Sequence, residues 1–135
     1  MGILQGGAGF PAGLGIPQNA GMTRADLIAL DEASYHRRLA GTPGLALVLF
    51  GGPDCGACRV AESRLPAAAP AGISLFKVDV QRATALARAF EVFHLPELFL
   101  YRDGHFHARL ACALSPPALA AALDRALAAP AEEEP

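Results

Sequence analysis

The stretch LALVLFGGPDCGAC, residues 45–58, decides how the rest of the sequence is interpreted. Its first part, Leu45–Phe50, is an uninterrupted apolar run of strand length, which is typical of a central parallel strand covered on both faces. The run leads directly to Cys55 and Cys58, and a helix is expected over 56–69. The segment therefore predicts a buried strand that delivers a C-x-x-C motif to the first turn of a helix.

Strand and helix patterns alternate on both sides of this segment. Before it, we expect a short edge strand over 26–30 and a helix that begins at its N-cap Asp31 and runs through Ala40. After it, the patterns predict a strand over 73–80, a helix over 82–93, hairpin strands over 98–101 and 105–111, and a last helix capped by Ser115. Because the Asp103-Gly104 turn makes the last two strands antiparallel, the order βαβαβαββα predicts one α/β domain with a mixed sheet.

Length and composition fit a single soluble domain. The chain has 135 residues, of which 53% are hydrophobic, so it can bury a core. Its 11 Lys and Arg against 13 Asp and Glu give a formal charge of −2, which is too balanced for a protein that binds nucleic acid by counterion release. No apolar run approaches the about 18 residues that a membrane-spanning helix needs. Neither nucleic acid nor a membrane is therefore an expected partner.

The two ends of the chain differ from its middle. Seven of the 14 glycines lie in residues 1–21, so we predict a flexible leader over 1–23, the folded domain over 24–128 and an acidic disordered tail over 129–135. The leader carries no charged side chain and so lacks the basic region of a secretory signal. We therefore expect a cytoplasmic protein.

The three cysteines indicate redox chemistry. Cys55, Cys58 and Cys112 cannot all pair within one chain, and in a reducing compartment a C-x-x-C motif at a strand–helix junction favours thiol–disulfide exchange. The amides and dipole of the helix N-terminus lower the pKa of a thiol placed there, so Cys55 is the predicted nucleophile. Cys58, one turn into the helix, is the predicted resolving thiol, which attacks the mixed disulfide and releases the reduced partner. This chemistry requires no prosthetic group.

These motifs together resemble the thioredoxin family over about residues 24–128. The sequence from Leu27 to Cys55 fits the family pattern without a gap, including the helix residues Tyr35 and Leu39. Further matches are Leu95-Pro96, Arg102-Asp103-Gly104 and Ala113-Leu114-Ser115. The resemblance implies a thioredoxin fold, with a central mixed β-sheet flanked by helices on both faces.

The resemblance also implies a substrate groove beside the cysteines. Leu95-Pro96 stands where the family has a cis-proline packed opposite the cysteines, and the implied substrate-binding residues are Gly56, Ala57, Leu95, Pro96 and Cys112. Cys112 occupies a position that is usually glycine in the family. It is open to two interpretations, a small buried hydrophobe or a third thiol that takes part in disulfide exchange.

The sequence departs from the family pattern near the motif. The chain has no tryptophan, although the family usually has two just before its first cysteine. Leu49 stands where the family keeps a buried acid that moves a proton to and from the inner cysteine. Lys77 occupies the place of the lysine that accompanies that acid, and we interpret it as a strand lysine that extends to water beside Asp79. These departures predict slow reduction of a general disulfide substrate such as insulin.

Other residues near the motif are candidate modulators. Asp54 would oppose thiolate formation at Cys55 if the two side chains approach each other, because like charges repel. His94 could approach Cys55 and stabilise its thiolate, or it is an exposed loop histidine. Glu97 replaces a residue that is often threonine in the family and could bias which substrates dock. His105 and His107 alternate along one predicted strand, and we interpret them as a solvated strand face.

We therefore predict a monomeric, cytoplasmic thiol-disulfide oxidoreductase that acts on protein disulfides in cell redox homeostasis. By the resemblance, its electrons come from a flavin-dependent thioredoxin reductase or another dithiol. One alternative is a thioredoxin-fold chaperone or assembly factor that binds a client without redox turnover. A metal site built from Cys55, Cys58, Cys112 and His94 is a further alternative, but one C-x-x-C lacks the paired motifs of structural zinc sites, so no metal is expected.

Overall fold

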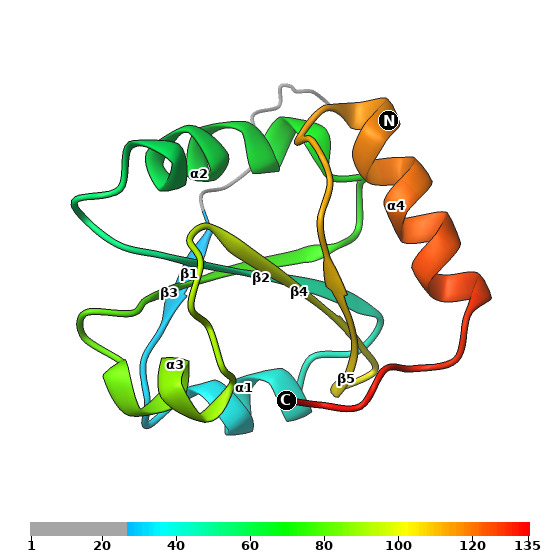
Figure 1. Cartoon of the computed structure of the whole chain (residues 1–135). Helices are drawn as coiled ribbons and strands as arrows, with labels where there is room; N and C mark the ends of the chain where they lie inside the picture. Colours follow the sequence, from blue (N-terminus) through cyan, green and yellow to red (C-terminus); the bar gives the residue numbers. More distant parts are fainter. Residues whose placement is uncertain (1–26) are drawn as a thin grey trace, which may run out of the picture.

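The computed structural model describes residues 27–135, which form a mixed five-stranded sheet with helices on both faces (Figure 1). The strands are β1 (Ile28–Leu30), β2 (Leu45–Gly51), β3 (Ser74–Asp79), β4 (Glu97–Arg102) and β5 (His105–Leu110). The helices are α1 (Tyr35–Ala40), α2 (Gly56–Ala68), α3 (Thr84–Ala89) and α4 (Pro116–Ala128). The predicted order βαβαβαββα is confirmed, whereas the predicted leader over 1–23 lies outside the described residues.

Strand β2 lies at the centre of the sheet, whose order is β1-β3-β2-β4-β5. It pairs in parallel with β3 and antiparallel with β4. Because side chains alternate along a strand, Leu47 and Leu49 enter one hydrophobic core while Val48 and Phe50 enter another. This burial on both faces explains why the run over 45–50 shows no polar alternation.

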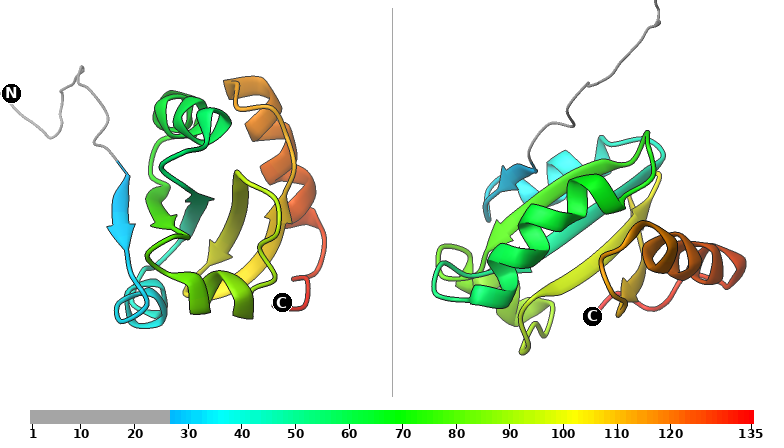
Figure 2. Two further views of the ribbon diagram at one scale, coloured as in Figure 1. Left: turned by 60° about the vertical axis from the view of Figure 1, so that its left-hand side comes forward. Right: turned by 90° about the horizontal axis from the view of Figure 1, so that it is seen from above.

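Helices α2 and α4 lie on one face of the sheet and helices α1 and α3 on the other (Figure 2), and a hydrophobic core lies under each pair. Helices α2 and α4 cover an aliphatic core that includes Leu65 and Leu119. Helices α1 and α3 cover an aromatic core, in which the Phe50 and Phe99 ring centroids are 4.9 Å apart. The other aromatic members are Tyr35, Phe76, Phe90, Tyr101 and Phe106. The aliphatic core supports the helix that begins at the C-x-x-C motif.

Helix α1 begins later than the sequence predicts. A turn over 31–34 precedes it, in which Asp31 and Ser34 exchange hydrogen bonds: the Ser34 amide donates to Asp31 Oδ1 at 2.8 Å, and the Asp31 amide donates to Ser34 Oγ at 3.0 Å. The bonds from Ser34 hold the pKa of Asp31 below its usual range, because they favour the ionised carboxylate. Asp31 thus organises the start of the helical segment as a turn residue, while Ser34 occupies the N-cap position.

Helix α3 is shorter than the predicted helix over 82–93. It ends at Ala89, because Glu91 has a φ of 56°, a left-handed conformation that a right-handed helix cannot continue through. The Val92 amide then donates to the Ala87 carbonyl at 2.9 Å and closes the helix end. Phe93, the last residue of the predicted helix, lies beyond this reversal and is 75% exposed.

The turn between β4 and β5 rests on the loop before β2. Asp103 and Gly104 have φ values of 51° and 84°, as a two-residue hairpin turn requires. The Asp103 amide donates to the Gly44 carbonyl, and the Gly44 amide donates to Asp103 Oδ1, both at 2.8 Å. A Cβ at Gly104 would lie only 2.8 Å from the Ala40 carbonyl oxygen. The turn therefore needs glycine for its conformation and for its close contact.

Gly104→Ala is expected to lower the free energy of unfolding by about 2–4 kcal/mol, because backbone strain and a backbone clash add up. Gly72→Ala is a matched control, because Gly72 also has a positive φ, of 89°, but no other atom lies within 4 Å of the position that its Cβ would take. The control should lose only about 1–2 kcal/mol. Urea unfolding of both variants measures the difference. Equal losses would show that the contact with Ala40 has no energetic weight.

Strand β5 carries an irregularity that the sequence does not predict. Leu100 pairs with Ala108 but Tyr101 pairs with Phe106, so His107 is an extra residue. Its side chain is buried, and its Nε2 lies 2.7 Å from the Ala126 carbonyl oxygen at the end of α4. The prediction of a solvated face is therefore wrong for His107, although His105 is exposed.

The acidic tail over 129–135 returns to the edge of β5 (Figure 1). It is exposed along almost its whole length, in keeping with its charge. The Glu132 amide nevertheless donates to the His107 carbonyl at 2.7 Å, and Glu132 Oε1 accepts from the Arg109 amide at 3.1 Å. The segment predicted to be disordered therefore hydrogen-bonds to the edge strand.

Candidate active site

Cys55 and Cys58 form a disulfide at the N-terminus of α2, with their Cα atoms 5.2 Å apart. Cys55 is the N-cap residue, and its Sγ accepts a hydrogen bond from the Cys58 amide at 3.1 Å. Cys55 is half-buried, whereas Cys58 is 5% exposed. The sulfur of Cys55 is therefore the outer one of the pair, and a backbone amide of the helix N-terminus points at it. Such an amide stabilises a thiolate.

The end of β2 fits closely around the inner cysteine. A Cβ at Gly51 would lie 3.0 Å from the Cys58 Cβ and 3.3 Å from its Sγ. The Gly51 carbonyl also accepts a hydrogen bond from the Val80 amide at 2.9 Å, which ties the ends of two parallel strands together. Gly51 thus lets the inner cysteine pack against the end of the sheet.

A groove of about 290 Å³ lies beside the disulfide. Of the predicted substrate-binding residues, Ala57, Pro96 and Cys112 line it together, although they come from three separate parts of the chain. Gly56 is exposed in the first turn of α2, and the half-buried Leu95 packs against the aromatic core. The Leu95–Pro96 peptide bond is cis. The remaining lining residues are Leu49, Val60, Ala61, Arg64, Glu97, Leu98, Leu110, Ala111 and Leu114.

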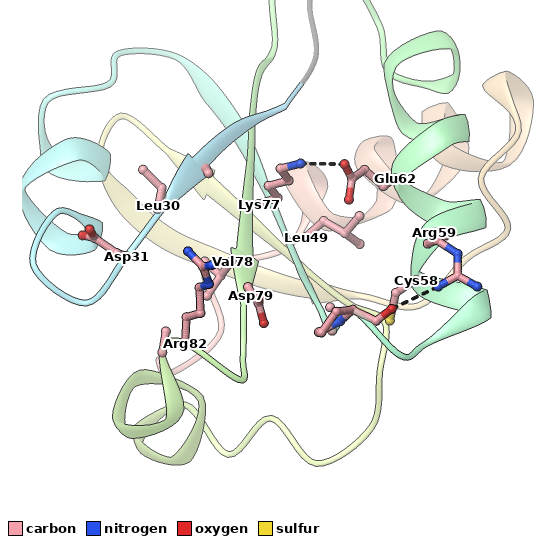
Figure 3. Close-up of a pocket in the computed structure, with 15 residues that line it drawn as sticks. Leu30, Asp31, Leu49, Cys58, Arg59, Glu62, Lys77, Val78, Asp79 and Arg82 are labelled. Atoms are coloured by element: carbon pink, nitrogen blue, oxygen red, sulfur yellow. Dashed lines mark hydrogen bonds and ion pairs between the residues drawn. The ribbon is translucent and has the colours of Figure 1, made fainter.

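A second cavity, of about 520 Å³, is lined in part by Cys58 (Figure 3). Leu49 and Lys77 are neighbours in the parallel register of β2 and β3, and both line this cavity. The Lys77 ammonium pairs with Glu62 Oε2 at 2.6 Å. The side chain of Lys77 is 36% exposed and thus reaches water as predicted, but its ion-pair partner is Glu62 on α2 and not Asp79.

Glu62 is a site residue that was not predicted from the sequence. It follows Cys58 by four residues, and this spacing places both residues on one face of α2. That spacing was the available signal, but its pairing with Lys77 depends on the position of β3. Leu49 has no carboxylate. The carboxylates that line the cavity belong to Asp31, Glu62 and Asp79.

Two arginines, which were also not predicted, hold the loops around the disulfide. Arg59 donates to the Pro53 carbonyl at 3.0 Å and so fixes the turn before Cys55. Arg109 pairs with Glu97 Oε2 at 2.5 Å and donates to the Phe90 carbonyl at 3.2 Å. The Arg109 guanidinium therefore joins both ends of the loop that carries Leu95 and Pro96.

The candidate modulators Asp54 and His94 are both exposed, and within residues 27–135 no hydrogen bond or ion pair joins either to Cys55. Cys112 is half-buried in the groove. Burial raises the pKa of the Cys112 thiol, and the positive charge of Arg125 opposes this effect in part. Cys112 at neutral pH is consequently a thiol rather than a thiolate.

The part of the chain that the structure describes has neither a metal-binding cluster nor a membrane-spanning helix. No group of three or more His, Cys, Asp or Glu side chains between residues 27 and 135 is arranged to hold a metal ion. Over the same residues, none of the helices has the length and apolar character needed to cross a membrane.

Comparison with known proteins identifies the family. The sequence profile of the thioredoxin family matches residues 26–125. Protein disulfide-isomerase A3 of Gallus gallus is 34% identical over 83 residues, which are 59% of this chain and 16% of that protein, so the chain spans less than a fifth of its relative. The zinc-bound form of human ERp44 superimposes with a TM-score of 0.63 at 19% identity, over 75% of this chain and 30% of that one. The chain belongs to the thioredoxin family.

Proposed function

We propose that this protein is a thiol-disulfide oxidoreductase that reduces or exchanges disulfides in protein substrates through Cys55 and Cys58. The observation that carries the proposal is the position of the disulfide: its outer sulfur is half-buried at a helix N-terminus, and Ala57, which lies between the two cysteines, lines a groove together with Pro96. The family membership supports this class of chemistry.

The reaction needs only the two cysteines of the motif. In the reduced protein, the Cys55 thiolate attacks one sulfur of a substrate disulfide, and the other substrate sulfur leaves as a thiolate that takes up a proton. The Cys58 thiol then loses its proton and attacks Cys55, so the Cys55–Cys58 disulfide forms and the second substrate sulfur leaves. The substrate gains two electrons, and the protein ends in the disulfide form. A flavin-dependent reductase or another dithiol is the proposed electron donor.

Substrate docking is assigned to the groove. Gly56 and Ala57 at the start of α2, with Leu95, Pro96 and Cys112, are the proposed contacts of an extended substrate segment. We further propose that the protein acts as a monomer and in the cytoplasm, and both statements stay predictions from the sequence.

The proposal is tested by the midpoint potential of the Cys55–Cys58 couple, obtained by equilibrating the protein with glutathione buffers and counting alkylated thiols by mass. We expect one reversible two-electron transition, with the same midpoint in Cys112→Ser because that thiol lies outside the disulfide. A midpoint below about −220 to −260 mV identifies a reductant in the cytosol, and a much higher one identifies an oxidant or isomerase. The absence of a reversible disulfide would contradict the proposal.

A client-binding chaperone is the second candidate, and the apolar lining of the groove favours it. Such a protein would not need the cysteines. Partner capture by the Cys55→Ser/Cys58→Ser double variant distinguishes the two functions: a binder keeps its partners, whereas an oxidoreductase loses those it holds as mixed disulfides.

A further inference from the structure

Among residues 27–135, one charged residue that lines the groove beside the disulfide has no ion-pair partner. Its only charged lining residues within the described chain are Arg64 and Glu97. The Glu97 carboxylate is paired with Arg109 at 2.5 Å, and its side chain is only 16% exposed. Arg64 is exposed, and between residues 27 and 135 the structure has no ion pair for it. The guanidinium of Arg64 is therefore the charge that the groove offers to an incoming molecule.

A second cation reinforces this charge. Arg125, in the last turn of α4, interacts electrostatically with the Cys112 thiol in the groove. Both cations therefore act on the same groove, because Cys112 and Arg64 line it together. No carboxylate of the groove lining offsets them, since Glu97 is neutralised by Arg109. An anionic side chain is the complement of this surface.

The rest of the lining is apolar and only partly covered. Val60 on α2 is 50% exposed, and it lies with Ala57, Leu98 and Leu110 around the same groove. At about 290 Å³ the groove is at the lower limit of small-molecule sites, so its size suits a few side chains of a peptide. An apolar client side chain would be removed from water there.

The spacing along α2 relates the charge to the reacting sulfur. Arg64 follows Cys55 by nine residues, so the two lie about 13 Å apart along the helix axis. An extended peptide covers that distance in about four residues. A client cysteine joined to Cys55 would therefore place the residue about four positions away near Arg64, and the residues between over the apolar lining.

We propose that the preferred substrates are protein disulfides with two features near the reacting cysteine. An apolar residue stands next to this cysteine, and on the same side an acidic residue about four positions away pairs with Arg64. This specificity rests on the proposed oxidoreductase function. It assigns Arg64 as a residue that selects the substrate and takes no part in the exchange of sulfurs.

The test uses the full-length, reduced protein and peptide disulfide dimers, in which both halves are identical. Each reaction joins Cys55 to Cys58 and releases two peptide thiols, which are counted by mass. One peptide set has Leu next to cysteine and Glu four positions away, on either side of the cysteine. The comparison sets replace Glu with Lys, move Glu to the seventh position, or replace Leu with Gly.

We expect the Glu peptide to react about threefold faster than the Lys peptide, with a smaller ratio at high salt, because an exposed ion pair is weak and screened. The Gly peptide should react about tenfold more slowly. Arg64→Glu should reverse the preference and Arg64→Gln should remove it. Arg37→Glu is the matched control, because Arg37 is an exposed arginine on α1, which covers the opposite face of the sheet.

The outcomes separate the two proposals. If all peptides react at the same rate in the wild type and in Arg64→Glu, the specificity is wrong and the oxidoreductase function stands. If no peptide disulfide is reduced, the oxidoreductase function itself is wrong. If Arg37→Glu changes the preference for the Glu peptide as much as Arg64→Glu does, the preference reflects the net charge of the protein. That result would overturn the assignment of the preference to the groove.

Discussion

Cys55→Ser is expected to lower the rate of disulfide reduction by at least about a thousandfold, because it removes the attacking sulfur. Cys58 cannot replace it, since its side chain is 5% exposed and packs against Gly51 at the end of β2. The assay is single-turnover reduction of insulin or of a peptide disulfide by the prereduced protein. The variant should remain folded, because serine differs from cysteine by one atom at a half-buried position.

Cys58→Ser should give a different result from Cys55→Ser. Cys55 still attacks the substrate, but nothing resolves the mixed disulfide, so a covalent complex accumulates that mass spectrometry detects and dithiothreitol releases. Cys112→Ser is the comparison variant: it should still reduce substrate and should not accumulate the covalent complex, because that thiol lies outside the Cys55–Cys58 disulfide. If Cys55→Ser reduces substrate at the wild-type rate, the mechanism is excluded. If formation of the covalent complex depends on Cys112, that thiol is a second nucleophile.

Much of this site could be predicted from the sequence because its determinants are local. An apolar run followed by a C-x-x-C motif specifies a buried strand, a helix start and two sulfurs within bonding reach, and the structure has all three. The Asp103-Gly104 hairpin is local in the same sense, since both residues tolerate positive φ. Local patterns therefore sufficed for the order of elements and for the disulfide.

The errors involve backbone reversals and contacts between distant segments. Glu91 adopts a left-handed conformation that a residue other than glycine rarely takes, so apolar spacing through Phe93 gave a helix that was too long. His107 is buried because β5 has an extra residue, and only the paired register reveals it. The partner of Lys77 is decided by where α2 lies over β3. These features depend on contacts between segments that are distant in the chain, and local sequence patterns do not specify such contacts.

The tyrosine pair in the aromatic core is expected to make the fold unstable in alkali. Tyr35 and Tyr101 are the two tyrosines of the chain, both are buried, and their hydroxyl oxygens lie 2.8 Å apart in a shared hydrogen bond. Burial is the main cause that raises the pKa of both tyrosines. The pKa of Tyr101 is raised to about 12, and that of Tyr35 is raised further, with the neighbouring Tyr101 adding to its shift. Each phenol is therefore held neutral in the folded state.

The sign of the pH effect follows from these shifts. Unfolded tyrosines ionise near pH 10, so above that pH the unfolded chain loses protons that the folded chain keeps, and the free energy of unfolding falls by about 1.4 kcal/mol per pH unit for each tyrosine. Stability from this pair is fully present below about pH 10, and the part due to Tyr101 is lost as the pH rises through about 12.

Urea unfolding between pH 8 and pH 12 measures how steeply the free energy of unfolding falls with pH. Tyr35→Phe/Tyr101→Phe should lose about 1 kcal/mol at pH 8 with the hydrogen bond, yet show a much flatter decline in alkali. A decline as steep in the double variant as in the wild type would assign the alkaline instability to other groups.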